Sequence, residues 1–278
     1  MKLLRYGPAG QERPGLLDAT GTLRDLSGQV GDITPDLLSR AQLSALAAID
    51  PASLPAIEGR PRLGVPVAGI GQVVAAGLNY ADHAAESGMA VPDEPVLFLK
   101  SVSSLAGADD RVALPPGSAK ADWEVELGVV IGRTARHVAE ADAMEHVAGF
   151  CVVNDLSERS FQLERGGTWD KGKGCDGFGP VGPWLVTADE VADPQALELW
   201  LDLNGEAMQR GSTRTMVFGV AVLVAYISRF ITLRPGDLVI TGTPPGVGMG
   251  RKPQRFLRAG DVMELGITGL GRQRQEVA

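Results

Sequence analysis

Apolar and polar residues alternate most regularly between residues 122 and 132. Four apolar residues lie at odd positions: Val125, Leu127, Val129 and Ile131. In a β-strand they share one face, and Glu124 and Glu126 share the other. Two carboxylates on one face repel each other and resist burial unless a positive group lies between them. The stretch therefore fits two structures: a strand that holds a divalent metal ion, and a surface strand whose polar face lies in water.

The rest of the hydrophobic pattern consists mainly of short apolar runs separated by turn-forming residues. Such runs indicate buried strands. We expect them at residues 73–78, 95–100, 148–154, 180–186, 199–203, 238–241 and 262–267. A longer apolar run predicts a buried helix over residues 217–230. Together these elements predict an α+β, β-rich fold that closes as a roll or sandwich.

Residues 1–70 are predicted to form a small N-terminal domain with its linker, and residues 71–278 a second domain. In the first, we expect a hairpin around the turn at 19–21. A helix should follow, with Thr34 as its N-cap and Pro35 as its first residue. Prolines and glycines then recur from about residue 50 to residue 71, which is typical of an irregular linker.

Composition narrows the function classes. The chain has 278 residues, 44% of them hydrophobic and 22% charged, as expected for a folded globular protein. Its formal charge of -8 argues against nucleic-acid or anionic-membrane partners, which require a basic surface. The N-terminus does not resemble a signal peptide, and residues 216–227 are too few to span a bilayer. The two cysteines are far apart, so we expect no disulfide framework and a cytoplasmic location.

Three further positions carry polar groups suited to chemistry. His83 and Glu86 are three residues apart on a predicted short helix, where they form either a water-activating pair or a solvated ion pair. Lys100 ends a predicted strand. Asp155 follows the strand at 148–154, and it is either the N-cap of the next helix with Glu158 as capping-box partner, or a third oxygen ligand.

A glycine-rich segment contains a formal G-x-G-x-x-G match at Gly172, Gly174 and Gly177. A strand rather than a helix is predicted to follow it, so no helix N-terminus is available for a pyrophosphate and we reject dinucleotide binding. These glycines instead suit a loop that brings Lys173 close to a bound group. A second glycine-proline loop spans residues 242–250, and its backbone amides can approach a ligand.

Eight spaced motifs make the chain resemble the fumarylacetoacetate hydrolase family. In chain order they are Asn79-Tyr80-x-x-His83-x-x-Glu86, Phe98-x-Lys100, Glu124-x-Glu126, Asn154-Asp155, Gly172-Lys173, Asn204-Gly205, Pro235-Gly236-Asp237 and Thr241-Gly242-Thr243-Pro244. The resemblance covers roughly residues 70–278, and the N-terminal unit is similar to a small domain found in one branch of the family. Within the family the chain is most similar to the 2,4-diketo-3-deoxy-L-rhamnonate or L-fuconate hydrolases, a branch often labelled ureidoglycolate lyase.

The resemblance implies a mixed β-sandwich roll and an enzyme that cleaves a carbon-carbon bond of a 2,4-diketo acid, giving pyruvate and a hydroxy acid. It implies a homodimer. Three carboxylates, Glu124, Glu126 and Asp155, would bind the metal, and such a set suits Mg²⁺ or Mn²⁺. The implied catalytic residues are His83, Glu86 and Lys173. The implied substrate contacts are Tyr80, Lys100, Arg159, Gln162 and Thr243.

Other activities remain open on the same residues. The same metal site would serve an oxaloacetate decarboxylase or tautomerase, a 2-hydroxymuconate-type isomerase, or a 2-oxo-enoate hydratase. The His83 and Glu86 pair favours water activation, and therefore hydrolysis. A different class is a non-catalytic β-rich module with a structural Ca²⁺ ion, against which the nearby lysines weigh.

Overall fold

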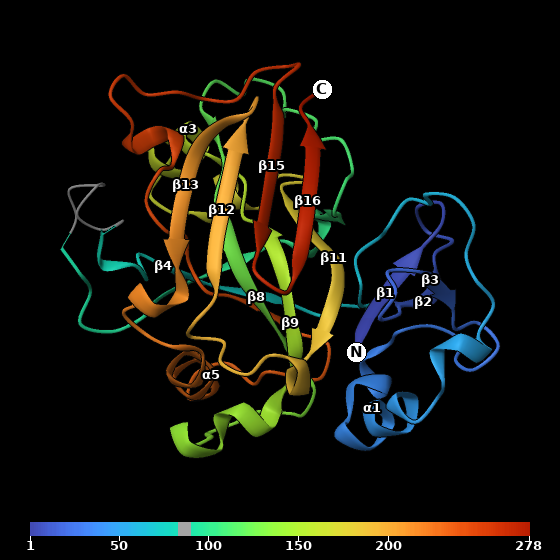
Figure 1. The fold of residues 1–278 in the computed structure, drawn as a ribbon. Coiled ribbons are helices and arrows are strands. Elements are labelled where there is room, and N and C mark those ends of the chain that lie inside the picture. The colour runs from blue at the N-terminus through green and yellow to red at the C-terminus, as the bar shows by residue number, and fades with distance from the viewer. Residues whose placement is uncertain (83–89) are drawn as a thin grey trace.

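The structure is a computed structural model that describes residues 1–82 and 90–278 (Figure 1). Its body consists of two β-sheets packed face to face, as predicted for an α+β, β-rich fold. In Figure 1, β12 and β15 of one sheet lie in front of β8 and β9 of the other. The apolar side chains between the two sheets form the main core.

The larger sheet has ten strands in the described part of the chain, in the order β3-β2-β1-β11-β9-β8-β14-β4-β5, with β6 paired to β11. These strands are β1 Lys2–Tyr6, β2 Arg13–Leu17, β3 Leu23–Asp25, β4 Val73–Gly77, β5 Val96–Lys100, β6 Leu105–Gly107, β8 Val125–Ile131, β9 Val147–Asn154, β11 Gly179–Thr187 and β14 Leu238–Ile240. The predicted strands at 95–100, 148–154, 180–186 and 238–241 are therefore confirmed within a residue or two.

The smaller sheet has the order β13-β12-β15-β16. Its strands are β12 Glu198–Leu203, β13 Glu206–Ser212, β15 Val262–Ile267 and β16 Gly271–Glu276. Asn204 and Gly205 join β12 to β13 with φ angles of 54° and 78°, the left-handed conformation that a tight hairpin turn requires. A separate two-stranded ladder pairs β7 Ala121–Asp122 with β10 Ser157–Glu158.

Strand β8 is buried along its whole length. Its odd-numbered apolar residues face the core between the sheets, as the alternation predicts. Its other face is also covered, because Val130 packs in a second apolar cluster with residues of the N-terminal strands. Glu126 on that face is only 2% exposed. The interpretation as a surface strand with a wet polar face is therefore wrong.

Short helices connect the strands. The α-helices whose whole length lies in the described residues are α1 Arg40–Ala47, α3 Arg159–Leu163, α4 Asp170–Lys173 and α5 Val220–Ser228. The 3-10 helices are Pro35–Leu38, Pro51–Ser53, Val102–Ser104, Glu140–His146, Ala188–Glu190, Thr213–Thr215 and Gly248–Gly250.

Helix starts were harder to predict than strands. The helix predicted from Pro35 is a 3-10 turn, and α1 begins only after Ser39, whose side chain accepts a hydrogen bond from Gln42 N. The predicted N-cap role of Asp155 is wrong. Glu158 caps α3 instead, by accepting a hydrogen bond from Ser160 N.

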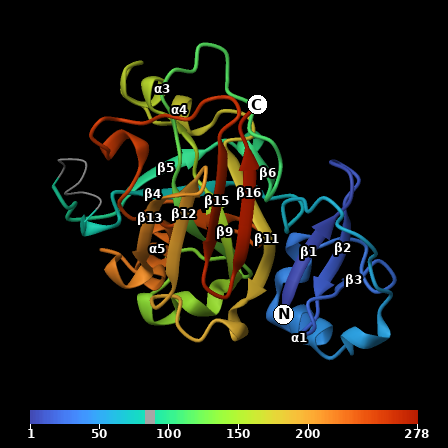
Figure 2. The same cartoon turned by 45° about the horizontal axis from the view of Figure 1, so that its top comes forward.

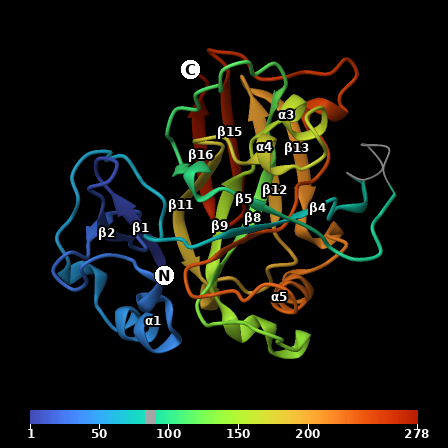
Figure 3. The ribbon, with the colours of Figure 1, turned by 180° about the vertical axis from the view of Figure 1, so that it is seen from behind.

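The N-terminal residues extend the larger sheet from one side (Figures 2 and 3). Strand β1 pairs antiparallel with β11, where Leu3 lies opposite Leu185. An ion-pair network also joins the two parts, since Arg62 contacts Glu12 at 2.8 Å and Asp110 at 2.6 Å. Division of the chain into two domains at residue 70 stays a prediction. In the described ranges, no helix is long and apolar enough to cross a bilayer, and both cysteines are free.

Candidate active site

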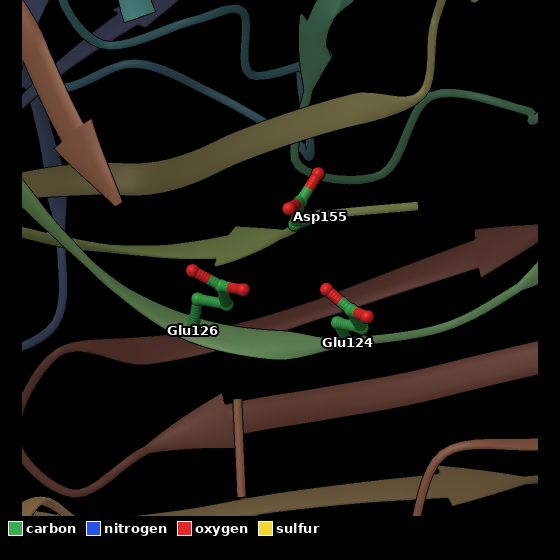
Figure 4. Close-up of side chains that lie close together, drawn as sticks. All are labelled: Glu124, Glu126 and Asp155. Atoms are coloured by element: carbon green, nitrogen blue, oxygen red, sulfur yellow. The ribbon is translucent and has the colours of Figure 1, made fainter. Parts of the chain in front are cut away.

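Three carboxylates converge where β8 and β9 run side by side (Figure 4). The two strands are antiparallel with Val125 opposite Asn154, so the next position outward places Glu124 opposite Asp155. A hydrogen bond of 2.9 Å from Asp155 N to Glu124 O holds this register. One oxygen from each of Glu124, Glu126 and Asp155 lies within 4.8 Å of the others. All three side chains are buried, with at most 5% exposure.

Two buried lysines contact this cluster. Lys173 Nζ lies 2.5 Å from Glu124 Oε2 and 2.7 Å from Asp155 Oδ2, so it bridges two of the carboxylates. Lys100 Nζ lies 2.7 Å from Asp155 Oδ1 and donates to the carbonyl oxygens of Leu156 and Lys173. Each oxygen of Asp155 therefore faces a different lysine, and the side chain is held in one orientation.

Helix packing carries Lys173 to the cluster. The lysine lies in α4 and not, as predicted, in an open loop. Helix α4 packs closely on α3 because Gly172 has no side chain: a Cβ there would lie 2.5 Å from Glu158 O and 2.6 Å from Gln162 Cβ. The strand β11 follows this glycine-rich segment, which agrees with the rejection of a dinucleotide site.

Arg159 is the third buried cation at the site. Its Nη2 donates to Glu124 Oε1 at 2.6 Å, its Nε to Asp122 Oδ2 at 2.9 Å, and its Nη1 to Gln162 Oε1 at 3.1 Å. All three nitrogens thus have a protein acceptor. The guanidinium fixes the second oxygen of Glu124 from the side opposite to Lys173.

Asp122 is a site residue that the sequence reasoning missed. Its carboxylate is fully buried and accepts four hydrogen bonds, from Arg159 Nε and from the backbone amides of Trp123, Gly248 and Met249. It therefore ties the arginine to the short 3-10 helix after the glycine-proline loop. The sequence does contain one indication of this role. Residue 122 is even-numbered, as are Glu124 and Glu126, so strand alternation puts a third acid on the same face.

Burial and neighbouring charges shift the proton affinities of the cluster. Burial, and then the carboxylates of Asp155 and Glu124, raise the pKa of Glu126 well above its ordinary range. Burial lowers the pKa of Lys100, an effect that Asp155 only partly offsets. Burial also acts to lower the pKa of Lys173, but Asp155 and Glu124 outweigh it, so this pKa is raised. The site as a whole favours additional positive charge beside its acids.

The donor set fits a hard divalent cation. Glu124, Glu126 and Asp155 offer only oxygen atoms, which is what Mg²⁺ and Mn²⁺ prefer. Glu126 accepts a hydrogen bond of 2.7 Å from Gly242 N, which orients its carboxylate toward the cluster.

A cavity of about 80 Å³ opens beside the carboxylates. Its polar lining consists of Glu124, Glu126, Arg159, Gln162, Lys173 and Thr243. Its apolar lining consists of Ala76, Gly77, Leu78, Phe98, Leu163, Trp169 and Met249. Six of the sequence-predicted site residues therefore line one cavity, and Asp155 and Lys100 lie directly behind it.

The hydroxyl of Thr243 is hydrogen-bonded to other groups of the protein. Its hydroxyl donates to Val125 O at 2.9 Å and accepts from Gln209 Nε2 at 2.8 Å. The neighbouring amide of Gly242 is taken by Glu126. These contacts tie the glycine-proline loop to β8, and a substrate-binding role for Thr243 stays a prediction.

Tyr80 lies outside the cavity lining. It is fully buried, and its hydroxyl has no hydrogen-bond partner among the described residues. Burial, followed by the charges of Glu126 and Asp82, raises its pKa. The hydroxyl is thus held protonated near the cluster, and its predicted substrate contact is untested.

Asn79 anchors the segment that leads to the predicted catalytic pair. Its side-chain nitrogen donates to Phe218 O at 2.9 Å and to Thr241 O at 2.8 Å, and its oxygen accepts from Phe218 N at 2.8 Å. His83 and Glu86 themselves lie outside the described residues. Their predicted role rests on spacing and on the resemblance.

Comparison with known proteins agrees with this geometry. The family described as fumarylacetoacetate (FAA) hydrolase C-terminal matches residues 72–278. A Burkholderia lata protein, named no more specifically than a hydrolase, is 62% identical over 276 residues, which is 99% of this chain and 98% of that protein.

Solved structures with similar folds include several enzymes. Fumarylacetoacetate hydrolase from Exiguobacterium antarcticum has a TM-score of 0.89 and 34% identity, covering 100% of this chain and 99% of that one. Maleylpyruvate hydrolase from Sphingobium sp. SYK-6, in complex with manganese(II) and pyruvate, has a TM-score of 0.83 and 29% identity, with coverage of 100% and 99%. A 5-carboxymethyl-2-hydroxymuconate delta-isomerase from Mycobacterium smegmatis has a TM-score of 0.77 and 30% identity, with coverage of 100% and 98%. The family match, these similarities and the buried carboxylate cluster agree: the chain belongs to the fumarylacetoacetate hydrolase family.

Proposed function

We propose that the protein hydrolyses a carbon-carbon bond of a 2,4-diketo acid and releases pyruvate. The observation that carries the proposal is the buried cluster of three carboxylates, contacted by two lysines and an arginine, at one side of a small cavity. In the reaction, water adds a hydroxyl group to C4, and the C3–C4 bond breaks. C3 then takes up a proton and becomes the methyl group of pyruvate, and C4 becomes the carboxyl group of the second acid.

Charge balance supports an anionic substrate at this site. The described site holds the carboxylates of Asp122, Glu124, Glu126 and Asp155, and the cations Lys100, Arg159 and Lys173. One divalent cation would change the formal charge from slightly negative to slightly positive. A slightly positive buried site attracts an organic acid, although the whole chain carries a charge of -8.

Mg²⁺ or Mn²⁺ bound by Glu124, Glu126 and Asp155 would supply Lewis-acid polarisation of the substrate oxygens. Lys173 contacts Glu124 and Asp155 with its ammonium group and stabilises negative charge that develops on the pyruvate half. Lys100 fixes the orientation of Asp155.

The proton-transfer groups in this proposal are His83 and Glu86. A histidine beside a glutamate has a pKa suited to taking a proton from water near neutral pH.

The direct test is a panel of 2-oxo and 2,4-dioxo acids, with pyruvate release followed by reduction with lactate dehydrogenase and NADH. We expect release with Mg²⁺ or Mn²⁺ and none after dialysis against a chelator. Glu126→Gln and Asp155→Asn should lower activity by about 100-fold or more, since each removes a proposed ligand. Glu198→Gln changes an exposed glutamate of β12 and should keep full activity. Unchanged turnover in both site variants would refute the metal site.

A second candidate uses the same residues for isomerisation, tautomerisation, hydration or decarboxylation. The similarity to an isomerase over the whole chain favours it. An isomerase would change the ultraviolet absorbance of a conjugated 2-oxo acid without releasing pyruvate, and a decarboxylase would release carbon dioxide from oxaloacetate. A Ca²⁺-binding module would lose thermal stability on chelation and show no turnover at all.

The second half of the substrate is a separate question. A sugar-acid derivative of the L-rhamnonate or L-fuconate type is one candidate, and it would carry hydroxyl groups beyond C4. The side chains that line the cavity help to decide which chemical class this end of the substrate belongs to.

A further inference from the structure

Five large apolar side chains line the cavity, and we call them the apolar wall: Leu78, Phe98, Leu163, Trp169 and Met249. Leu78 directly follows β4 and Trp169 directly precedes α4, while the other three come from β5, α3 and the 3-10 helix at 248–250. Leu163 is 50% exposed and lies at the cavity mouth. Five separate chain segments thus contribute to the same apolar surface.

The aromatic part of the wall lies directly beside the charged cluster. Phe98 and Trp169 make an edge-to-face contact with ring centroids 5.2 Å apart. Lys173 Nζ lies 5.2 Å from the centroid of the Phe98 ring. Trp169 fits only because residue 77 is glycine, since a Cβ there would lie 2.5 Å from the indole Cζ3. The aromatic pair and the carboxylates of Glu124 and Glu126 therefore line the same cavity.

Leu78 lines the cavity from a strained backbone position. Its φ angle is 55°, in the left-handed region that a branched side chain rarely adopts. The strand predicted at 73–78 is confirmed to within one residue: β4 ends at Gly77, and Leu78 begins the turn that follows. The hydrogen bonds of Asn79 to Phe218 and Thr241 hold this turn in place. Strain of this kind persists only where the surrounding structure holds the residue in place, as these hydrogen bonds do.

The polar groups of the described lining are mostly committed to one another. Three of the five N–H groups of Arg159 donate to protein oxygens, and Lys173 Nζ directs two of its three N–H groups to carboxylates. The Thr243 hydroxyl donates to Val125 O. Gln162 accepts from Arg159 with its oxygen, which leaves its amide nitrogen as a neutral donor. One such donor suits a single carbonyl oxygen, not a carboxylate or a row of hydroxyls.

We infer that the substrate's end beyond C4 is neutral and apolar, such as an alkyl, alkenyl or aryl group, and is neither polyhydroxylated nor carboxylated. The inference rests on the proposed function and specifies its substrate class. Hydroxyl groups placed against the apolar wall lose their water without gaining a partner from these five side chains, and a second carboxylate loses more. The wall therefore selects against both.

Three acids with one six-carbon skeleton test this selection. They are 2,4-dioxohexanoate, 5,6-dihydroxy-2,4-dioxohexanoate and 2,4-dioxohexanedioate, and hydrolysis of each releases pyruvate. With Mg²⁺ present, we expect kcat/KM for the first to exceed that of the other two by at least about tenfold. Equal or better use of the dihydroxy acid or the diacid would overturn the inference and leave the proposed function intact. If none of the three, nor any acid of the wider panel, released pyruvate, the proposed function itself would fall.

Two pairs of variants test whether the apolar wall causes the preference for 2,4-dioxohexanoate. Leu78→Asn puts a polar side chain in the wall, and asparagine tolerates the left-handed backbone, so the variant should fold. His137→Asn is its matched control, since His137 has a φ of 52° and does not line the cavity. Leu163→Gln is paired with Leu99→Gln, because Leu99 is 48% exposed and is also absent from the lining. Both wall variants should reduce the preference for 2,4-dioxohexanoate to within about threefold, and both controls should keep it. An unchanged preference in both wall variants would contradict the role of the wall.

Discussion

Replacing Asp122 with asparagine tests whether this buried acid organises the site. The substitution keeps the shape of the side chain and can keep one oxygen, which accepts from the amides of Trp123 and Gly248. The other oxygen becomes an NH₂ group. It then faces Arg159 Nε at 2.9 Å and Met249 N at 3.0 Å, both of which are donors.

The expected cost follows from these contacts. A charge-assisted hydrogen bond contributes about 1.5–3 kcal/mol, and a buried amide left without an acceptor costs about 1–3 kcal/mol. The sum, about 2.5–6 kcal/mol, brackets the usual cost of about 3–5 kcal/mol for removing one partner of a buried ion pair. For a chain of this size, a cost of about 3–5 kcal/mol should lower the melting temperature by roughly 5–10 °C. Arg159 also loses its orientation toward Glu124, which is a proposed metal ligand. Loss of a residue that helps to orient a metal ligand typically lowers activity about 10–100-fold, and we expect kcat/KM to fall by that factor.

The control variant removes the aspartate of a more exposed Asp–Arg ion pair. Arg210 Nη2 lies 2.5 Å from Asp202 Oδ1, but the two side chains are 54% and 25% exposed. Asp202→Asn should therefore cost less than about 1 kcal/mol and leave activity unchanged. Urea unfolding gives the free energies, and pyruvate release gives the activities. The reasoning is refuted if Asp122→Asn unfolds within about 1 kcal/mol of the parent and keeps its activity.

Three further predictions follow from other parts of the structure. Gly77→Ala should displace the Trp169 indole, because the added Cβ would lie 2.5 Å from Cζ3; we expect a change in tryptophan fluorescence and a loss of about 1–3 kcal/mol in stability. Mg²⁺ at 100 times its dissociation constant should stabilise the parent by about 2.7 kcal/mol in thermal or urea unfolding, and should not stabilise Asp155→Asn; equal stabilisation of both would place the ion elsewhere. The stability difference between the parent and Asp110→Asn should be largest above about pH 4. Burial favours the neutral acid of Asp110, but the Arg62 guanidinium outweighs it and holds the pKa below its ordinary value of 3.8, so the folded state favours the carboxylate. The ionised Asp110 stabilises the folded protein above pH 3.8, and this contribution is lost as the pH falls through the lower pKa of the folded state. The free energies of urea unfolding of the parent and the variant should therefore converge as the pH is lowered.

The residues that could be predicted from the sequence are those whose roles depend on local periodicity. Alternation along β8 placed Glu124 and Glu126 on one face, because a strand turns successive side chains to opposite sides. Asn204 and Gly205 predicted a tight hairpin, because few residues accept the left-handed turn it needs. The motif order then indicated the family.

The tertiary structure decided which of these groups meet. Asp155 becomes the third acid because the register of β8 against β9 puts it opposite Glu124, and a register involves residues thirty positions apart. Lys100 and Lys173 reach the same carboxylate from β5 and α4, which no local pattern relates.

Backbone strain and close packing likewise arise only in the folded chain. The sequence indicates that residue 78 is apolar and residue 77 is small, which suits an ordinary strand. In the fold, Leu78 takes a left-handed turn into the cavity, and Gly77 admits the Trp169 indole. Local periodicity therefore determined the face that carries Glu124 and Glu126. Long-range packing determined the charged cluster around that face and the apolar wall beside it, because both are assembled from distant segments.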